Sequence, residues 1–178
     1  GAFDQQLGQA KPFLEKNHIV FQPGVNEDMA ATAVWGSQQL NLGPQSKYDG
    51  VYGIWYGKAP GVDRCGDVVR HANHAGTDPN GGVLMMCGDD HAAVSSTVPG
   101  QSEHNLASWM VPMLYPAGVQ EYLDYGLLGW AMSRYAGVWV GFKCVSEVVE
   151  SSASVDVDAH RLDIQYPDFE MPEGGLNI

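Results

Sequence analysis

The sequence predicts an α/β fold, in which a mostly parallel β-sheet is flanked by helices. Segments with strand composition alternate along the chain with segments whose apolar residues recur at helical spacing, which is the order that a parallel sheet with crossover helices requires. One predicted strand, Val83-Leu-Met-Met-Cys87, is apolar at every position, and such runs suit strands that are covered on both faces. The 178 residues are enough for one domain with a substantial core.

Helices are predicted where apolar residues recur every three or four positions between suitable start and stop residues. They span residues 3–14, 26–40, 66–75, 103–110 and 117–136. Pro12 interrupts the first, which predicts a kinked or shortened helix, and Gly76 ends the third. Strands are predicted at residues 18–22, 51–56, 83–87, 112–115 and 138–142, and polar loops at 57–64 and 88–102.

The composition changes after Glu150, where a polar segment rich in serine and aspartate begins. We therefore expect one domain over residues 1–150 and an extended tail over 151–178 that leads to a further domain. The chain begins Gly1-Ala2-Phe3 without an initiator methionine, so we expect a piece cut from a longer protein, with its N-terminal part missing.

Charge and cysteine usage exclude several classes of function. Asp and Glu number 21 against 9 Lys and Arg, a formal net charge of −12, which argues against a nucleic-acid-binding surface. Apolar runs are too short to span a membrane, and no N-terminal signal is visible. Cys65, Cys87 and Cys144 form no C-x-x-C pair and so no recognisable zinc or iron–sulfur motif. Scattered cysteines favour a reducing compartment, and we expect a cytoplasmic protein.

The segment Gln22-Pro-Gly-Val-Asn-Glu27 joins a predicted strand to a predicted helix. Asn26 opens the alanine-rich helix, and Glu27 lies in its first turn. A carboxyl group at this junction lies on the side of the sheet where open α/β folds bind ligands. Two interpretations remain open at this point: Glu27 takes part in proton chemistry, or it only complements the helix dipole.

The loop that contains Lys58, Gly57-Lys-Ala-Pro-Gly61, lies between a strand and a helix, as phosphate-binding loops do. It fits neither G-x-x-x-x-G-K-[ST] nor G-x-G-x-x-G. An ordinary turn is therefore the better interpretation of its spacing.

The segment Gly88-Asp89-Asp90-His91 directly follows the apolar strand. Aspartate and histidine side chains together can ligate a metal, and His71 and His74 on a predicted helix could complete such a site. The alternative is a polar loop at the end of a strand, with two half-exposed histidines on a helix.

Ser95 or Ser96, together with His91 and an aspartate, would also allow a serine hydrolase. This hypothesis is weakened because the chain contains no G-x-S-x-G nucleophile elbow.

Several long segments combine into a more specific pattern. They include Trp55-Tyr-Gly-Lys-Ala-Pro-Gly-Val-Asp-Arg64, Gly88-Asp-Asp-His-Ala-Ala-Val-Ser-Ser-Thr97 and Pro116-Ala-Gly-Val-Gln-Glu-Tyr-Leu-Asp-Tyr-Gly126, with residues 24–39, 66–73 and 151–158. On these segments, which together represent essentially the whole chain, the sequence resembles bacterial indolepyruvate ferredoxin oxidoreductases, members of the 2-oxoacid:ferredoxin oxidoreductase family.

The resemblance implies the pyrimidine-binding domain of a thiamine diphosphate enzyme. In that family the glutamate at the start of this helix hydrogen-bonds N1′ of the cofactor's aminopyrimidine, and Glu27 occupies its position, with Gly24 and Asn26 expected beside the cofactor. The hydrogen bond favours the imino tautomer of the 4′-amino group, which can then accept the proton from C2 of the thiazolium. By the strand-end rule, Lys58, His91, Ser95 and Ser96 become candidates for binding the 2-oxoacid or the cofactor.

Thiamine enzymes bind the diphosphate through Mg²⁺ with a G-D-G motif and a later pair of asparagines. Gly88-Asp89-Asp90 is not that motif, and no such pair follows it. We therefore expect no metal ligands in this chain, and expect Mg²⁺, the diphosphate and the iron–sulfur clusters to lie in other domains.

The activity implied is oxidative decarboxylation of an aryl 2-oxoacid, such as indolepyruvate, to the acyl-CoA, with ferredoxin as electron acceptor. The expected partners are the 2-oxoacid, CoA, ferredoxin and a diphosphate-binding domain in the same or another chain, within a homodimer, and this segment alone should be inactive. Two alternatives stay open: a metal-dependent hydrolase that uses Asp89, Asp90 and His91, and a non-catalytic assembly domain.

Overall fold

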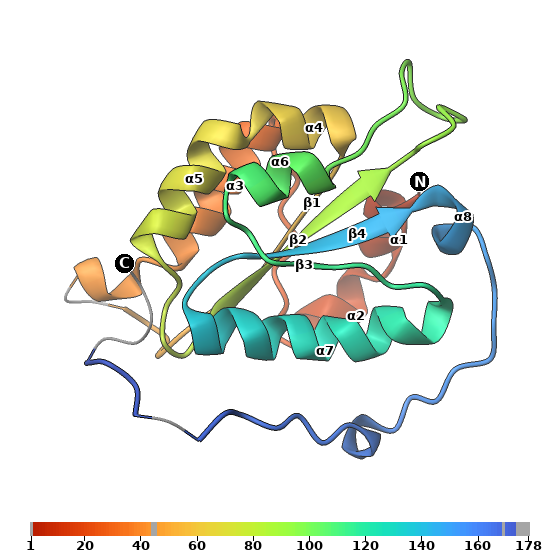
Figure 1. Cartoon of the computed structure of the whole chain (residues 1–178). Coiled ribbons are helices and arrows are strands. Elements are labelled where there is room, and N and C mark those ends of the chain that lie inside the picture. The colour runs from red at the N-terminus through yellow and green to blue at the C-terminus, as the bar shows by residue number, and fades with distance from the viewer. Residues whose placement is uncertain (1, 44–45, 169, 174–178) are drawn as a thin grey trace.

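The computed structural model describes residues 2–43, 46–168 and 170–173. Within these ranges the strands form one sheet, in the order β1-β2-β4-β3, and every neighbouring pair is parallel (Figure 1). The strands are β1 (Tyr52–Lys58), β2 (Gly82–Asp89), β3 (Met113–Leu114) and β4 (Val140–Val145). The predicted α/β fold with a parallel sheet flanked by helices is confirmed.

Helices cover both faces of the sheet. They are α1 (Phe3–Gln9), α2 (Lys11–Lys16), α3 (Glu27–Ser37), α4 (Ala59–Arg64), α5 (Gly66–Ala75), α6 (Glu103–Ser108), α7 (Val119–Ala136) and α8 (Ser146–Val149), with short 3₁₀ turns η1 (Leu40–Leu42) and η2 (Ala159–Arg161). Helices α3 to α6 lie over one face and α7 over the other (Figure 1). Both faces of β2 and β4 are therefore covered, as the apolar run in β2 predicted.

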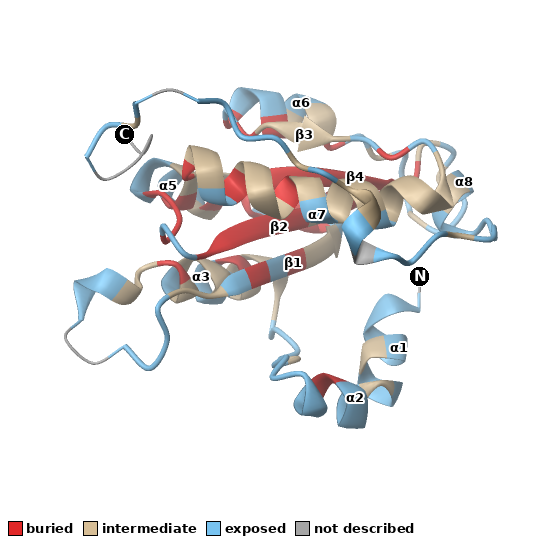
Figure 2. Cartoon of the chain, turned by 90° about the horizontal axis from the view of Figure 1, so that it is seen from below, coloured by how far each residue is buried: buried red, intermediate tan, exposed pale blue. Residues whose placement is uncertain are grey.

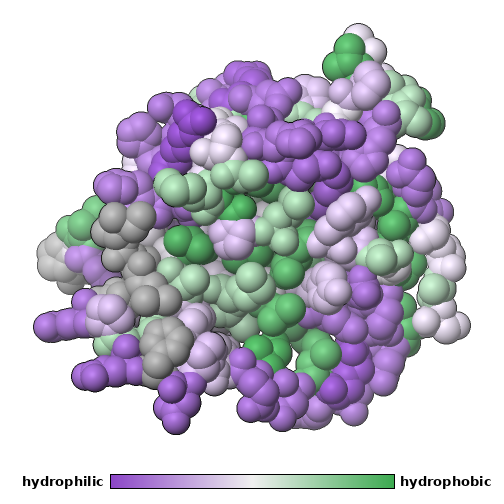
Figure 3. All heavy atoms as spheres, in the orientation of Figure 1, coloured by the Kyte–Doolittle hydropathy of each residue, from purple (hydrophilic) through white to green (hydrophobic). Residues whose placement is uncertain are grey.

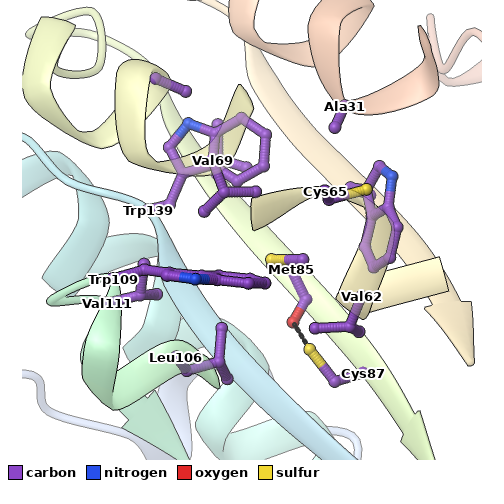
Figure 4. Packing of buried hydrophobic residues seen from close by; sticks show 13 residues of the cluster. Ala31, Val62, Cys65, Val69, Met85, Cys87, Leu106, Trp109, Val111 and Trp139 are labelled. Carbon is purple, nitrogen blue, oxygen red and sulfur yellow. Dashed lines mark hydrogen bonds between the residues drawn. The ribbon is translucent and has the colours of Figure 1, made fainter. Parts of the chain in front are cut away.

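Alternate residues of β2 point to opposite faces of the sheet. Met85 contributes to the core beneath α3 to α6, which also contains Val69 and the indole ring of Trp139 (Figure 4). Leu84 points to the opposite face, where a Cβ on Gly129 of α7 would lie 2.5 Å from its Cδ2. The small residue in α7 thus permits a very close approach of this helix to the sheet.

All five predicted helices are present; α5 has the predicted ends, and the other four are shifted. The first is divided at Ala10 into α1 and α2, and Pro12 lies in the first turn of α2, where it costs no backbone hydrogen bond. Helix α5 ends at Gly76, whose φ of 82° favours glycine. Helix α7 begins at Val119, two residues later than predicted.

Two predictions of local structure are wrong. Residues 18–22 form no strand: His18 has a positive φ of 58°, and Ile19 and Val20 are exposed. A strand requires a hydrogen-bonded neighbour, and in the described residues β1 pairs only with β2. The predicted loop at 57–64 contains a helix, α4, with Pro60 in its first turn, a position that favours helix formation and that the sequence interpretation overlooked.

The described residues of the tail after α8, 150–168 and 170–173, contain no helix or strand apart from the 3₁₀ turn η2, and this segment lies along α7 (Figure 1). The Gln120 side chain donates to the Asp156 carbonyl at 3.1 Å and accepts from the Asp156 N–H at 2.7 Å. Arg161 pairs with Asp124, one turn further along α7. These contacts direct the tail toward the face of the sheet that α7 covers.

Burial is greatest in the central strands, whereas α1 and α2 project from the body (Figure 2). Figure 3 shows apolar side chains gathered across the middle of the face that carries β3 and α7; Met110, Leu123 and Leu127 are exposed. Among the described residues, none of the helices combines the length and the apolar character that a membrane crossing requires.

Two glycines of α7 provide a matched test of its packing. Gly126 has open space around its Cα, so Gly126→Ala should stabilise the protein by up to about 1 kcal/mol through helix propensity. Gly129→Ala gains the same propensity, but its methyl group meets Leu84, at a cost of about 1–3 kcal/mol. Urea unfolding should therefore find Gly129→Ala less stable than Gly126→Ala by about 1–3 kcal/mol. Equal stabilities would contradict the close packing of α7 on β2.

Candidate functional site

Glu27 is the first residue of α3, and the backbone around it is fixed on two sides. Asn26 is the N-cap, and its side chain accepts a hydrogen bond from the N–H of Met29 at 2.9 Å. The indole Nε1 of the buried Trp55 donates to the carbonyl of Glu27 at 3.0 Å. The start of α3 is thus held against β1, which confirms the predicted role of Asn26 as the residue that opens the helix.

The carboxylate of Glu27 is 43 % exposed and faces α4. Arg64 Nη1 lies 3.5 Å from its Oε2, while Arg64 Nη2 lies 3.1 Å from Asp28 Oδ1. Exposed pairs of this kind contribute little to stability. A Cβ on Gly61 would lie 2.6 Å from the Cγ of Glu27, so the glycine in α4 provides the room that this side chain occupies.

Gly24 lies two residues before the N-cap. A Cβ at this position would approach the Cβ of Ala30 to 2.7 Å. Gly24 therefore lets the incoming chain pass close to the first turn of α3, and Gly24, Asn26 and Glu27 form one compact turn.

Lys58, at the end of β1, contacts the loop that follows β2. Its Nζ donates to the carbonyl of Ser95 and lies 3.3 Å from the Ser95 hydroxyl. Asp90 accepts from the N–H groups of Ser95 at 2.7 Å and Val94 at 2.9 Å. These hydrogen bonds, together with the Ser96 side chain and the charge of Lys58, hold the pKa of Asp90 below its usual range.

A second polar cluster lies at the ends of β2 and β4; its members Asp89, Ser102 and Lys143 are buried, and Glu103 is partly exposed. Asp89 Oδ2 accepts from the N–H and hydroxyl of Ser102 at 3.0 and 2.9 Å. Lys143 Nζ lies 3.3 Å from the same oxygen and donates to Glu103 Oε2 at 2.5 Å. The ammonium also lies over the ring of Tyr115, 4.9 Å from its centroid.

The charges of this cluster stabilise one another. Burial acts to raise the pKa of Glu103, but the hydrogen bond and charge of Lys143 outweigh it, so the pKa lies below the usual value. Burial acts to lower the pKa of Lys143, but Glu103 and Asp89 raise it above the usual value. Both groups therefore stay charged at neutral pH.

The structure corrects the metal-ligand set Asp89, Asp90 and His91. Asp90 is turned into its own loop, whereas Asp89 and His91 each place one potential ligand atom within 4.8 Å of a third residue, Glu103. In the described part of the chain this is the one such group, and it contains neither of the predicted helix histidines, His71 and His74.

The predicted helix histidines lie on α5, and His71 stands beside Asp67 of the same helix, with its Nδ1 2.9 Å from the Asp67 carbonyl oxygen. The serine hydrolase arrangement is not assembled either. Over residues 2–43 and 46–168, no hydrogen bond joins His91 to Ser95 or Ser96, and Nε2 of His91 is buried without a partner.

Sequence reasoning missed Glu103, Lys143, Gly61 and Arg64. The strongest overlooked signal is Lys143, which is the one charged residue within the otherwise apolar strand β4. A buried lysine requires a carboxylate partner, so Lys143 in this strand is a sign that an acidic residue lies nearby in the fold. The sequence did not reveal that the partners are Asp89 and Glu103.

The thiols provide no further nucleophile. Cys65, Cys87 and Cys144 are free and buried. Burial raises the pKa of Cys65 and of Cys144 to about 12 and raises that of Cys87 as well. All three therefore remain protonated at neutral pH, and the thiolate is the reactive form.

No family model and no curated protein matches the chain.

The buried ion pair predicts a large stability effect. Lys143→Met should lower the free energy of unfolding by about 3–5 kcal/mol, because it leaves buried carboxylates without a cation. The double variant Asp89→Asn/Lys143→Met, which also removes the fully buried negative charge, should recover part of that loss. Chemical denaturation measures both. Wild-type stability of Lys143→Met would show that the pair is not needed.

The lowered pKa of Asp90 predicts that the stability of the protein depends on pH. A carboxylate whose pKa is lower in the folded than in the unfolded state adds stability above about pH 4, which is lost as the pH falls through the folded-state value. Asp90→Asn should therefore melt at a lower temperature than wild type at pH 7, and the difference should shrink toward pH 3. A difference that stays constant over this range would refute the role of the carboxylate.

Proposed function

We propose that this chain is the pyrimidine-binding domain of a thiamine diphosphate enzyme of the 2-oxoacid:ferredoxin oxidoreductase family, and that Glu27 binds N1′ of the aminopyrimidine. One observation carries the proposal: a carboxylate is held at the first turn of α3, next to α4, which begins where β1 ends. The parallel sheet agrees with such a domain, and the carboxyl ends of its strands form the edge where open α/β folds bind ligands.

The residues present fit the pyrimidine end of the cofactor. Among the described residues Glu27 is contacted by Arg64 through Oε2, which leaves Oε1 for a ligand atom. Gly61 keeps α4 clear of the Glu27 side chain, and Gly24 allows the tight turn before Asn26. Thiamine diphosphate, when bound, supplies the carbon nucleophile that decarboxylation of a 2-oxoacid requires.

In this proposal Glu27 acts as the proton donor and acceptor for N1′ of the aminopyrimidine. Its carboxyl group hydrogen-bonds N1′ and shares a proton with that nitrogen, which a general acid–base group can do only within about 2.6–3.2 Å. Its backbone is fixed by the N-cap of α3 and by Trp55. Fixed geometry of this kind is what orients a catalytic group before the substrate arrives.

Lys58, Ser95, Ser96 and His91 are proposed to contact the 2-oxoacid. Lys58 and Ser95 already touch at the carboxyl edge, and both are exposed. The ammonium group of Lys58 would pair with the carboxylate of the substrate by charge. His91, with its unpartnered Nε2, could donate a hydrogen bond to a developing oxyanion.

The complete reaction that we propose is oxidative decarboxylation of an aryl 2-oxoacid, such as indolepyruvate, to the acyl-CoA, with ferredoxin as electron acceptor. Its support is the resemblance of the sequence to this family. Mg²⁺ with the diphosphate and the iron–sulfur clusters would lie in other domains, of the same or a second chain, in a cytoplasmic homodimer. This segment alone would then be inactive.

The two alternative functions, a metal-dependent hydrolase and a non-catalytic assembly domain, are not equally supported. A hydrolase based on Asp89, Asp90 and His91 loses support because the Asp90 carboxylate is hydrogen-bonded to Val94 and Ser95 of its own loop, whereas Asp89 and His91 are grouped with Glu103. A non-catalytic assembly domain remains the competing proposal, and it predicts that the complete protein never binds thiamine diphosphate.

Glu27→Gln in the complete enzyme should lower turnover at least about 100-fold, because the amide cannot carry the proton. Asp28→Asn is the matched control: it removes the neighbouring carboxylate, which also lies in the first turn of α3 and also pairs with Arg64. The turnover of Asp28→Asn should stay within about threefold of wild type, because the proposal assigns Asp28 no contact with the cofactor. If Glu27 only complements the helix dipole, the two variants will lower stability alike and leave turnover unchanged.

A further inference from the structure

The buried cluster around Asp89 lies at a topological switch point of the sheet. Strands β2 and β4 are neighbours, but the chain that leaves β2 leads to α6 over one face. The chain that leaves β4 becomes the tail, which lies along α7 over the other face (Figure 1). Adjacent parallel strands whose connections diverge in this way form the crevice where α/β folds bind ligands.

The two carboxylate oxygens of Asp89 differ in their hydrogen bonding. Its Oδ2 takes two hydrogen bonds from Ser102 and the ion pair with Lys143. Its Oδ1 has no partner among the described residues, although the residue is only 2 % exposed. A buried carboxylate oxygen without a donor is costly and indicates an ion, a proton or a water molecule that completes the site.

His91 provides a second buried atom of the same kind. Its Nε2 also lacks a partner in the part of the chain that the structure describes. One ligand atom each from Asp89, His91 and Glu103 lies within 4.8 Å of the others. Two of the three residues that offer these ligand atoms, Asp89 and His91, therefore also have a buried polar atom without a hydrogen-bond partner among the described residues.

The charges of the cluster also leave room for a cation. Asp89 and Glu103 are negative and Lys143 is positive, so with a neutral His91 the group carries one net negative charge, and two of its charged residues, Asp89 and Lys143, are buried. Lys143 contacts only one oxygen of each carboxylate, Oδ2 and Oε2. Among the described residues Oδ1 of Asp89 is left for another ligand, while Lys143 acts as an outer hydrogen-bond donor of the sort that orients metal-binding carboxylates.

We propose that Asp89, His91 and Glu103 form a binding site for one divalent transition-metal ion. An imidazole with two carboxylates suits zinc, manganese or ferrous iron, with water at the remaining coordination positions. The site differs from the diphosphate-linked Mg²⁺ expected in another domain, and it does not depend on the proposed role of Glu27. It is an alternative to the substrate contact proposed for His91, because a ring nitrogen that ligates a metal has no hydrogen to donate.

The test is a calorimetric titration of the full chain with zinc chloride and, separately, manganese chloride, after treatment with a chelator. Wild type should bind one ion of at least one metal per chain. His91→Gln and Glu103→Gln should each weaken binding at least about tenfold, since each removes a direct ligand. His104→Gln is the matched control, because His104 is an exposed histidine of α6, next to Glu103, and it should bind as wild type does.

Two results would overturn the proposal. One is the absence of stoichiometric binding by wild type, combined with an NMR titration in which His91 keeps its proton at neutral pH; an imidazolium would then supply the missing charge. The other is equal weakening by His91→Gln and His104→Gln, which would show that the ion binds nonspecifically. Circular dichroism of each variant shows whether the fold is retained.

Discussion

The complete covering of β2 and β4 is the constraint on which the rest of the structure depends. Helices α3 to α6 cover one face of these strands and α7 the other, so the strands are built almost wholly from apolar residues. Polar side chains can then gather only where the strands end. Asp89 ends β2, and Lys143, the fourth of the six residues of β4, is tolerated because Asp89 and Glu103 pair with its ammonium group. The same edge receives Glu27 from α3 and Lys58 from β1.

The strands of the sheet could be predicted from local sequence because their own residues are apolar or typical of strands. The apolar run in β2 predicted burial on both faces, and Gly76 predicted the end of α5. The predicted strand at 18–22 failed because an apolar run becomes a strand only when a neighbouring strand pairs with it, and that pairing is not encoded locally. Helix α4 was missed because its composition resembles a turn, although Pro60 favours the first turn of a helix.

The candidate site was predictable only in part, for a related reason. Glu27 could be placed because its position depends on the adjacent N-cap and helix, which the sequence shows directly. The partners of Asp89 could not, because Ser102, Glu103 and Lys143 are brought to it by the fold from 13 to 54 residues away in sequence. Asp90 has different partners from its neighbour Asp89: it accepts hydrogen bonds from Val94 and Ser95 of its own loop, whereas Asp89 accepts from Ser102.

The carboxyl edge thus carries two separate groups, Glu27 beside α4 and the buried cluster between β2 and β4. A crystal structure of the complete protein with thiamine diphosphate bound tests the assignment of Glu27 most directly. We predict that a carboxylate oxygen of Glu27 lies about 2.6–3.2 Å from N1′ of the aminopyrimidine. A bound cofactor whose N1′ faces a different group, with Glu27 paired only to Arg64, would contradict the proposed function.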